Sequence, residues 1–113
     1  MQIKIPEYNV YIITNPTKTT LYTGVTNDLS VRLAEHWKSR GNPKSFSGKY
    51  YCYNLLYFER FDDISSAIER ETQIKKWSRA KKTELINAKN PSWVFLNQEI
   101  CGRWPPFDVK DRT

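Results

Sequence analysis

Residues 8–24, which read YNVYIITNPTKTTLYTG, decide the fold. The run 8–13 is rich in β-branched and aromatic residues, and so is the run 19–23, which Gly24 closes. Between the two runs lies an Asn-Pro pair at 15–16, which favours a turn. Two strand-like runs with turn chemistry between them predict a β-hairpin.

The first strand of this hairpin has two different faces. Side chains alternate along a strand, so Tyr11 lies on the face opposite to Val10 and Ile12. Tyr22, on the return strand, can project onto the same surface as Tyr11 if the register allows it. The hairpin therefore offers a place where two phenols can lie side by side.

Length and composition indicate one domain, 1–113, with a core of about 8–93 and a C-terminal tail, 94–113, whose last residues we expect to be loose. Only 39% of the residues are hydrophobic, so the core must be compact, and the aromatic residues supply much of its area. The net charge of +6 makes a polyanionic partner plausible, although charge alone is weak evidence for nucleic-acid binding.

The cellular compartment is predicted from what the sequence lacks. Cys52 and Cys101 have no metal-ligand spacing and are too few for a disulfide scaffold, so we expect reduced thiols. No apolar run approaches membrane-spanning length, and the N-terminus lacks the apolar core of a signal peptide. These features predict a cytoplasmic protein with no membrane partner.

After the hairpin the apolar period changes from that of a strand to that of a helix. Its apolar stripe has a spacing of four residues: Leu29, Leu33 and Trp37. Thr26 or Asn27 can cap this helix, and Asp28 suits its first turn. On the helical projection Arg32 and His36 border the buried stripe and do not lie on the solvated back. That position is unusual for an arginine.

Residues 38–49 are polar, basic and interrupted by Gly and Pro, which predicts a loop. A third strand follows at 50–59, with Tyr57 and Leu55 on one face and Leu56 and Phe58 on the other. Apolar residues on both faces predict a central strand that is covered on two sides.

A second helix at 64–77 carries the most informative residue. Its predicted apolar face is formed by four side chains: Ile64, Ala67, Ile68 and Ile74. Glu71 projects into the middle of that face, where an unpartnered carboxylate would cost several kcal/mol. Periodicity gives about even odds to two interpretations, a buried ion pair and a metal ligand at a cleft.

Ser78 can cap a third helix at 79–88, with Leu85 and Ile86 facing inward. Basic residues gather around the junction before it: Lys75, Lys76, Arg79, Lys81 and Lys82. Such a cluster can touch phosphates, although a basic run is more often a solvated face. The order of elements, β-β-α-β-α-α, predicts an α+β fold with a small, mostly antiparallel three-stranded sheet flanked by helices.

In combination these residues resemble the GIY-YIG nuclease superfamily, in particular its small stand-alone bacterial members. The motif appears as Asn9-Val10-Tyr11 and Tyr22-Thr23-Gly24, followed by Arg32, His36 and Glu71 in that order. The triplets are weakly specific, whereas the ordered series is strong. Asn9 departs from the usual first Gly, and Val25 stands where related excision-repair nucleases have Lys. Asn90 is our candidate for the late Asn of the family.

The resemblance implies catalysis by Tyr11, Tyr22, Arg32, His36 and Glu71. Glu71 would hold one divalent ion, Mg²⁺ or Mn²⁺, and Arg32 would complement phosphate charge. Tyr22 is the favoured base with Tyr11 orienting the water, and His36 is the alternative base. Expected substrate contacts come from five residues: Gly24, Asn90, Lys75, Lys76 and Arg79.

The leading hypothesis is a metal-dependent endonuclease that cuts DNA in repair or processing, guided by structure or nonspecific. A second is a nucleic-acid-binding module that keeps the fold without cleavage. A third, an RNA-binding protein of unrelated fold, has little beyond charge in its favour and would stack bases on an exposed sheet face.

Overall fold

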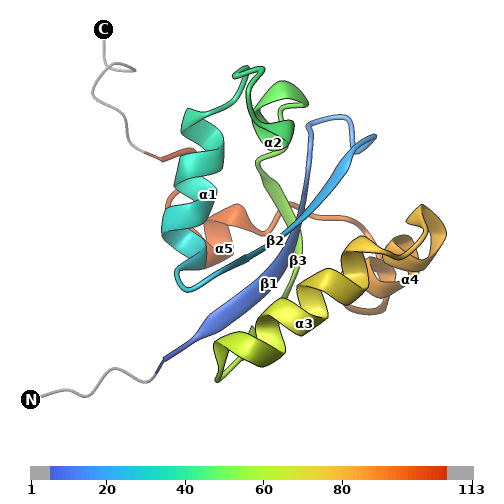
Figure 1. Cartoon of the computed structure of the whole chain (residues 1–113). Helices are drawn as coiled ribbons and strands as arrows, with labels where there is room; N and C mark the ends of the chain where they lie inside the picture. The colour runs from blue at the N-terminus through green and yellow to red at the C-terminus, as the bar shows by residue number, and fades with distance from the viewer. Residues whose placement is uncertain (1–5, 107–113) are drawn as a thin grey trace, which may run out of the picture.

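A computed structural model describes residues 6–106 of the chain. The fold is α+β, with a three-stranded antiparallel sheet flanked by helices, as predicted (Figure 1). The elements in chain order are β1 (Tyr8–Thr14), β2 (Leu21–Thr26), α1 (Leu29–Lys38), α2 (Phe46–Lys49), β3 (Asn54–Phe61), α3 (Ile64–Lys75), α4 (Arg79–Lys89) and α5 (Asn97–Cys101).

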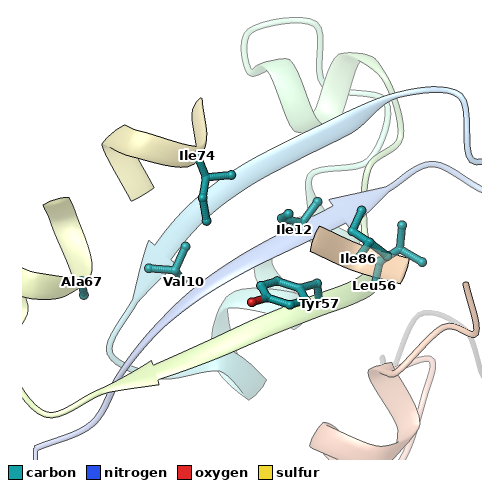
Figure 2. Close-up of a cluster of buried hydrophobic side chains, with 7 residues drawn as sticks. All are labelled: Val10, Ile12, Leu56, Tyr57, Ala67, Ile74 and Ile86. Atoms are coloured by element: carbon teal, nitrogen blue, oxygen red, sulfur yellow. The ribbon is translucent and has the colours of Figure 1, made fainter. Parts of the chain in front are cut away.

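The sheet separates two layers of helices. Helices α3 and α4 lie on one side of it, and α1 and α5 lie on the other (Figure 1). Val10 and Ile12 of β1 face α3 and α4, in a cluster with Ala67, Ile74 and Ile86 (Figure 2). Because side chains alternate along a strand, the residues between them belong to the opposite core. That second core comprises Tyr11, Ile13, Leu29, Leu33, Cys52 and Leu55.

The return strand is longer than predicted. Strand β2 does not end at Gly24 but runs through it to Thr26, and it begins at Leu21 instead of position 19. Gly24 lies opposite Tyr11 and Tyr22 lies opposite Ile13 in the antiparallel register. This register puts Tyr11 and Tyr22 on the same face of the sheet, with ring centroids 6.5 Å apart.

The central strand is β1, because the strand order is β2-β1-β3. The prediction of a central third strand at 50–59 was therefore wrong in two respects. The strand lies at the edge of the sheet, and it begins at Asn54 and not at position 50. Strand β3 carries apolar side chains on both faces because α3 and α4 cover one side of the sheet and α1 and α5 cover the other (Figure 1). Its outer edge is covered by the C-terminal segment, where the Leu55 N–H donates to Oδ1 of Asn97 (2.7 Å) and the Asn97 amide donates to the carbonyl of Tyr53 (2.8 Å). An outer strand of a sheet with helices on both sides therefore shows the same apolar pattern as a central strand.

A β-bulge changes which face of the sheet some side chains of β3 point to. Ile12 pairs with Tyr57 and Ile13 pairs with Leu55, so Leu56 is the extra residue. Leu56 and Tyr57 consequently face the same core, whereas the sequence predicted them on opposite faces.

Helix α1 begins one or two residues later than predicted, because neither Thr26 nor Asn27 is its N-cap. Asp28 is its N-cap and accepts a hydrogen bond from the Val31 N–H, so Asp28 is not in the first turn. Thr26 supports this cap by accepting from the Asp28 N–H at 3.0 Å. Ser78 caps α4 as predicted, by accepting from the Lys81 N–H.

Helix α3 buries a narrower face than predicted. Ala67 and Ile74 are fully buried, but Ile64 and Ile68 are 44% and 47% exposed. The helix also ends at Lys75, before the predicted Trp77.

Two segments predicted as irregular contain helix. The segment 38–49 includes α2, whose end carries hydrogen bonds from Cys52 to Ser47 (2.8 Å) and from Tyr51 to Gly48 (3.2 Å). Tyr51 has φ +58° there, a position that usually favours glycine. In the tail, α5 brings Ile100 onto the second core. The end of the tail, 109–113, lies outside the described residues.

Within residues 6–106 we find no helix that is both long and apolar enough to cross a bilayer.

Candidate active site

The site is built around the side chain of Tyr11, which lies across Gly24. A Cβ at position 24 would lie 2.5 Å from Cζ of Tyr11 and 2.9 Å from its Cε1. Only glycine leaves this space open, so Gly24 is needed for the position of the Tyr11 ring. The phenol then reaches the buried His36 of α1, with the hydroxyl 2.8 Å from Nε2.

His36 is held from its other side by α2. Nδ1 of His36 lies 3.1 Å from Oγ of the buried Ser47. The two bonds fix the plane of the imidazole and link β1, α1 and α2 through one side chain. The chain Tyr11–His36–Ser47 is therefore a buried polar network inside the second core.

The environment keeps this network uncharged at neutral pH. Burial lowers the pKa of His36 to about 4, and the positive charge of Arg32 acts in the same direction. Burial also raises the pKa of Tyr11 well above its ordinary value. A phenol with a raised pKa retains its proton, so Tyr11 is a neutral hydrogen-bonding partner of His36 and is poorly suited to act as a base.

Tyr22 is more accessible to solvent than Tyr11. Its ring lies edge-on to His36, with centroids 5.5 Å apart, and stacks on Phe46 of α2 at 6.1 Å. Its side chain is only partly buried. Within residues 6–106 no hydrogen-bond partner is seen for the Tyr22 hydroxyl, so this oxygen is available to water.

Arg32 lies one helical turn from His36, at the edge of the site. Its Nε is 3.6 Å from a carboxylate oxygen of Glu35, and its side chain is 44% exposed. An exposed i,i+3 pair of this kind is weak, so the guanidinium can change partners. Its charge nevertheless acts on both His36 and Tyr11, since it opposes the rise in the Tyr11 pKa.

Glu71 of α3 is close enough for its charge to act on Tyr11, whose pKa it helps to raise. Its side chain is only 15% exposed, and one carboxylate oxygen lies 3.5 Å from Nζ of Lys75. Both interpretations of this carboxylate therefore have support, since an ion pair is present and the site residues are near. The Lys75 side chain is half exposed, so it can move away and leave the carboxylate free.

The donor set fits a hard divalent cation. The residues from 6 to 106 contain no group of three or more His, Cys, Asp or Glu side chains placed to enclose a metal. A single carboxylate such as Glu71 suits Mg²⁺, which keeps several waters and takes further ligands from a substrate phosphate.

Asn90 is not brought to this group. Its amide donates to the carbonyls of Leu56 (3.0 Å) and Val94 (2.9 Å), and its oxygen accepts from the Val94 N–H (3.0 Å). Every polar atom of the side chain is thus used to hold the end of α4 against β3. We assign Asn90 a structural role and leave it out of the candidate site.

The three basic residues predicted to contact phosphate lie in three different surroundings. The guanidinium of Arg79 donates to the carbonyls of Thr19 (2.8 Å) and Lys18 (3.1 Å), so it supports the β1–β2 turn. Lys76 is exposed beside Trp77, and Lys75 lies at Glu71. Of these three, Lys75 is the one placed beside a residue of the candidate site.

Sequence reasoning missed Ser47 and Phe46. Both belong to a four-residue helix, which is too short for an apolar period to predict. The usable signal was local, since Ser45 can cap a helix and does so by accepting from the Gly48 N–H at 3.1 Å.

A comparison with protein-family models shows which family the chain belongs to. Residues 7–84 match the model of the GIY-YIG catalytic domain. The chain belongs to the GIY-YIG family. The matched stretch includes all five residues that the sequence predicted as catalytic in this GIY-YIG domain: Tyr11, Tyr22, Arg32, His36 and Glu71.

Individual relatives agree with this assignment. A UPF0213 protein of Natronomonas pharaonis is 38% identical over 80 residues, which cover 71% of this chain and 91% of the relative. A UPF0213 protein of Syntrophus aciditrophicus is 41% identical over 86 residues, covering 73% and 91%. A solution NMR structure of a UPF0213 protein from Bacillus halodurans has 26% identity and a TM-score of 0.49, and covers 77% of this chain and 89% of that one. The match of residues 7–84 to the family model shows that the chain carries a GIY-YIG domain, which has a nuclease-type fold.

Proposed function

We propose that this protein is a metal-dependent endonuclease that hydrolyses phosphodiester bonds in DNA. One observation supports this above the others: the Tyr11 hydroxyl lies 2.8 Å from Nε2 of His36, and the ring of Tyr22 lies 6.5 Å from that of Tyr11 and 5.5 Å from that of His36. The charges of Arg32 and Glu71 also act on Tyr11. Three consecutive elements, β1, β2 and α1, and the more distant α3 supply these groups. A buried network beside an accessible phenol and a shielded carboxylate is the kind of arrangement that phosphodiester hydrolysis requires.

Tyr22 is the proposed general base. Its hydroxyl is accessible, and as a phenolate, after its own proton has passed to solvent, it would take a proton from the attacking water as that oxygen bonds to phosphorus and the bond from phosphorus to the 3′ oxygen breaks. Tyr11 holds its own proton through burial and is hydrogen-bonded to Nε2 of His36, so its oxygen lone pairs can accept a hydrogen bond from the water. Tyr11 and His36 therefore orient the nucleophile, and Ser47 orients His36.

Arg32 is proposed to complement the negative charge that builds on the phosphate, because a guanidinium offers a planar pair of donors. It would exchange its weak contact with Glu35 for the phosphate. Glu71 would hold the divalent ion, Mg²⁺ or Mn²⁺, after Lys75 has moved aside. That ion, when bound, supplies Lewis-acid stabilisation of the phosphate and of the leaving 3′ oxygen.

The proposed substrate is DNA, cut in a structure-directed or nonspecific way during repair or processing. The net charge of +6 favours a polyanion. We retain the cytoplasm and a one-domain organisation as proposals, which cell fractionation and limited proteolysis would test.

The experiment is cleavage of supercoiled plasmid, duplex, flap and junction DNA by the whole chain, with and without Mg²⁺. We expect cut products only with the metal, and loss of cutting in Tyr22→Phe with an unchanged circular dichroism spectrum. Full activity in Tyr22→Phe would remove the phenol from the mechanism.

A non-catalytic nucleic-acid-binding module is the second candidate, and one observation favours it. The Glu71 carboxylate is paired with Lys75, as expected for a structural ion pair. This candidate predicts DNA binding without products in every metal condition, so the same assay separates the two functions.

A further inference from the structure

A pair of exposed aromatic side chains lies beside the candidate active site. Phe46 and Tyr50 are 51% and 41% exposed, and we call these two the α2 aromatic surface. Phe46 is the inner member, because it stacks on Tyr22 with an angle of 26° between the rings. Tyr50 follows outward from Phe46, with centroids 4.8 Å apart. A row of rings thus leads from the proposed general base to solvent.

The backbone beneath this surface is held firmly. Gly48 is buried, and a Cβ there would lie 2.5 Å from the Ser39 carbonyl and 2.7 Å from the Asn42 carbonyl. Ser45 caps the start of α2, and Ser47 is tied to His36. The aromatic rings are therefore presented on a fixed support, which reduces the entropy lost when a ligand binds.

The charged side chains in the segment that carries this surface are all cationic. Four cationic side chains and no acidic one occur in the run 38–52: Lys38, Arg40, Lys44 and Lys49. Nζ of Lys49 lies 5.4 Å from the ring centroid of Tyr50, so a cation and a ring are exposed together. Exposed rings alternating with lysines match a strand whose bases stack and whose phosphates are anionic.

We propose that the α2 aromatic surface binds an unpaired DNA base next to the phosphate that is cut, with Phe46 as the principal stacking residue. This inference rests on the proposed function only for the position of the cut. In a closed duplex the faces of the bases are already stacked, so a ring on α2 has no face to contact. The surface therefore favours single-stranded or frayed DNA over fully paired DNA.

The test measures binding separately from cleavage. The whole chain is titrated, with EDTA and no divalent metal, into a short single-stranded DNA carrying a fluorescent adenine analogue and into a paired duplex of the same sequence. The variants are Phe46→Leu, which keeps apolar bulk without a ring, and Phe46→Trp, which restores a ring. Phe95→Leu is the matched control, because Phe95 is also an exposed phenylalanine with a lysine over its ring.

Loss of one stacking contact corresponds to about fivefold or more in affinity. We expect Phe46→Leu to weaken single-strand binding by about that factor and to change duplex binding by less than about twofold. Phe46→Trp and Phe95→Leu should bind as wild type does, with the analogue quenched on binding.

Equal effects of Phe46→Leu on single-stranded and paired DNA, or no effect on either, would overturn the proposal. A chain that shows ring-dependent single-strand binding but cuts no DNA with Mg²⁺ would support this surface while refuting the endonuclease. A failure of the α2 aromatic surface to bind an unpaired base and a failure of the protein to cut DNA are thus detected by different measurements.

Discussion

Tyr11 occupies the space that a side chain at position 24 would need. The two residues are directly opposite in the β1–β2 register, and an added Cβ would lie 2.5 Å from Cζ of the tyrosine. The glycine of the Tyr-x-Gly triplet thus acts through its missing side chain. Its effect is to let a phenol from the central strand reach a histidine on α1.

Gly24→Ala should push the Tyr11 ring away from His36. Overpacking of this kind costs about 1–3 kcal/mol of stability, and the misplaced phenol should reduce cleavage at least about tenfold. Thermal unfolding and plasmid cleavage measure the two effects. Thr23→Val is the control in the same strand, because the Thr23 hydroxyl is buried without a partner and its loss should not lower stability. Wild-type cleavage by Gly24→Ala would refute the close-approach argument.

Ser47→Ala should leave the fold intact and loosen the imidazole of His36. Loss of one hydrogen bond, worth about 1 kcal/mol, should lower kcat roughly fivefold to tenfold with little change in KM. Nitrogen NMR of the His36 ring gives an independent measurement, because one tautomer in wild type should become a mixture in the variant. An unchanged ring spectrum would show that Ser47 does not orient His36.

His36 should make the protein less stable as the pH falls. Burial lowers the pKa of His36 from 6.5 to about 4, so the unfolded chain binds a proton in that interval that the folded chain does not. Stability therefore falls as the pH drops from 6.5 to about 4, by about 3 kcal/mol in the limit of the full shift. Denaturant unfolding at several pH values measures this slope.

The control for that slope is His36→Gln, which removes the titrating group and keeps a polar side chain of similar size. The variant should lose the part of the pH dependence that lies in this interval. A slope equal to that of wild type would assign the acid sensitivity to other groups.

Asn90→Ala should destabilise the protein without changing the chemistry. The variant leaves the carbonyls of Leu56 and Val94 and the Val94 N–H without their partner, which should cost about 2–3 kcal/mol. Cleavage per folded molecule, corrected by the folded fraction, should match wild type. A large drop in kcat at full folding would return Asn90 to the active site.

Periodicity predicted most of the fold because the hairpin and helices have clear patterns. The alternation of β1 places Val10 and Tyr11 in opposite cores, and the helical projection correctly predicts a buried His36. It failed where one residue breaks a repeat, as at the Leu56 bulge. It failed again at β3, because helices cover both faces of the sheet and give an outer strand the same apolar pattern as a central one.

The candidate site was partly predictable for a similar reason. Tyr11 and His36 could be placed by projection, but their contact depends on space at Gly24, which the sequence alone does not specify. Ser47 and Phe46 lie on a single helical turn, where no repeat exists to be read.

If the shielded carboxylate of α3 supports metal-dependent cutting, Glu71→Gln should abolish it. The measurement is the initial rate of plasmid cleavage against Mg²⁺ concentration for wild type, Glu71→Gln and Glu69→Gln, where Glu69 is an exposed carboxylate on the same helix. We predict that Glu69→Gln cuts as wild type does and that Glu71→Gln, although folded, shows no Mg²⁺-dependent products. Wild-type cleavage by Glu71→Gln, with the same dependence on Mg²⁺, would contradict the account.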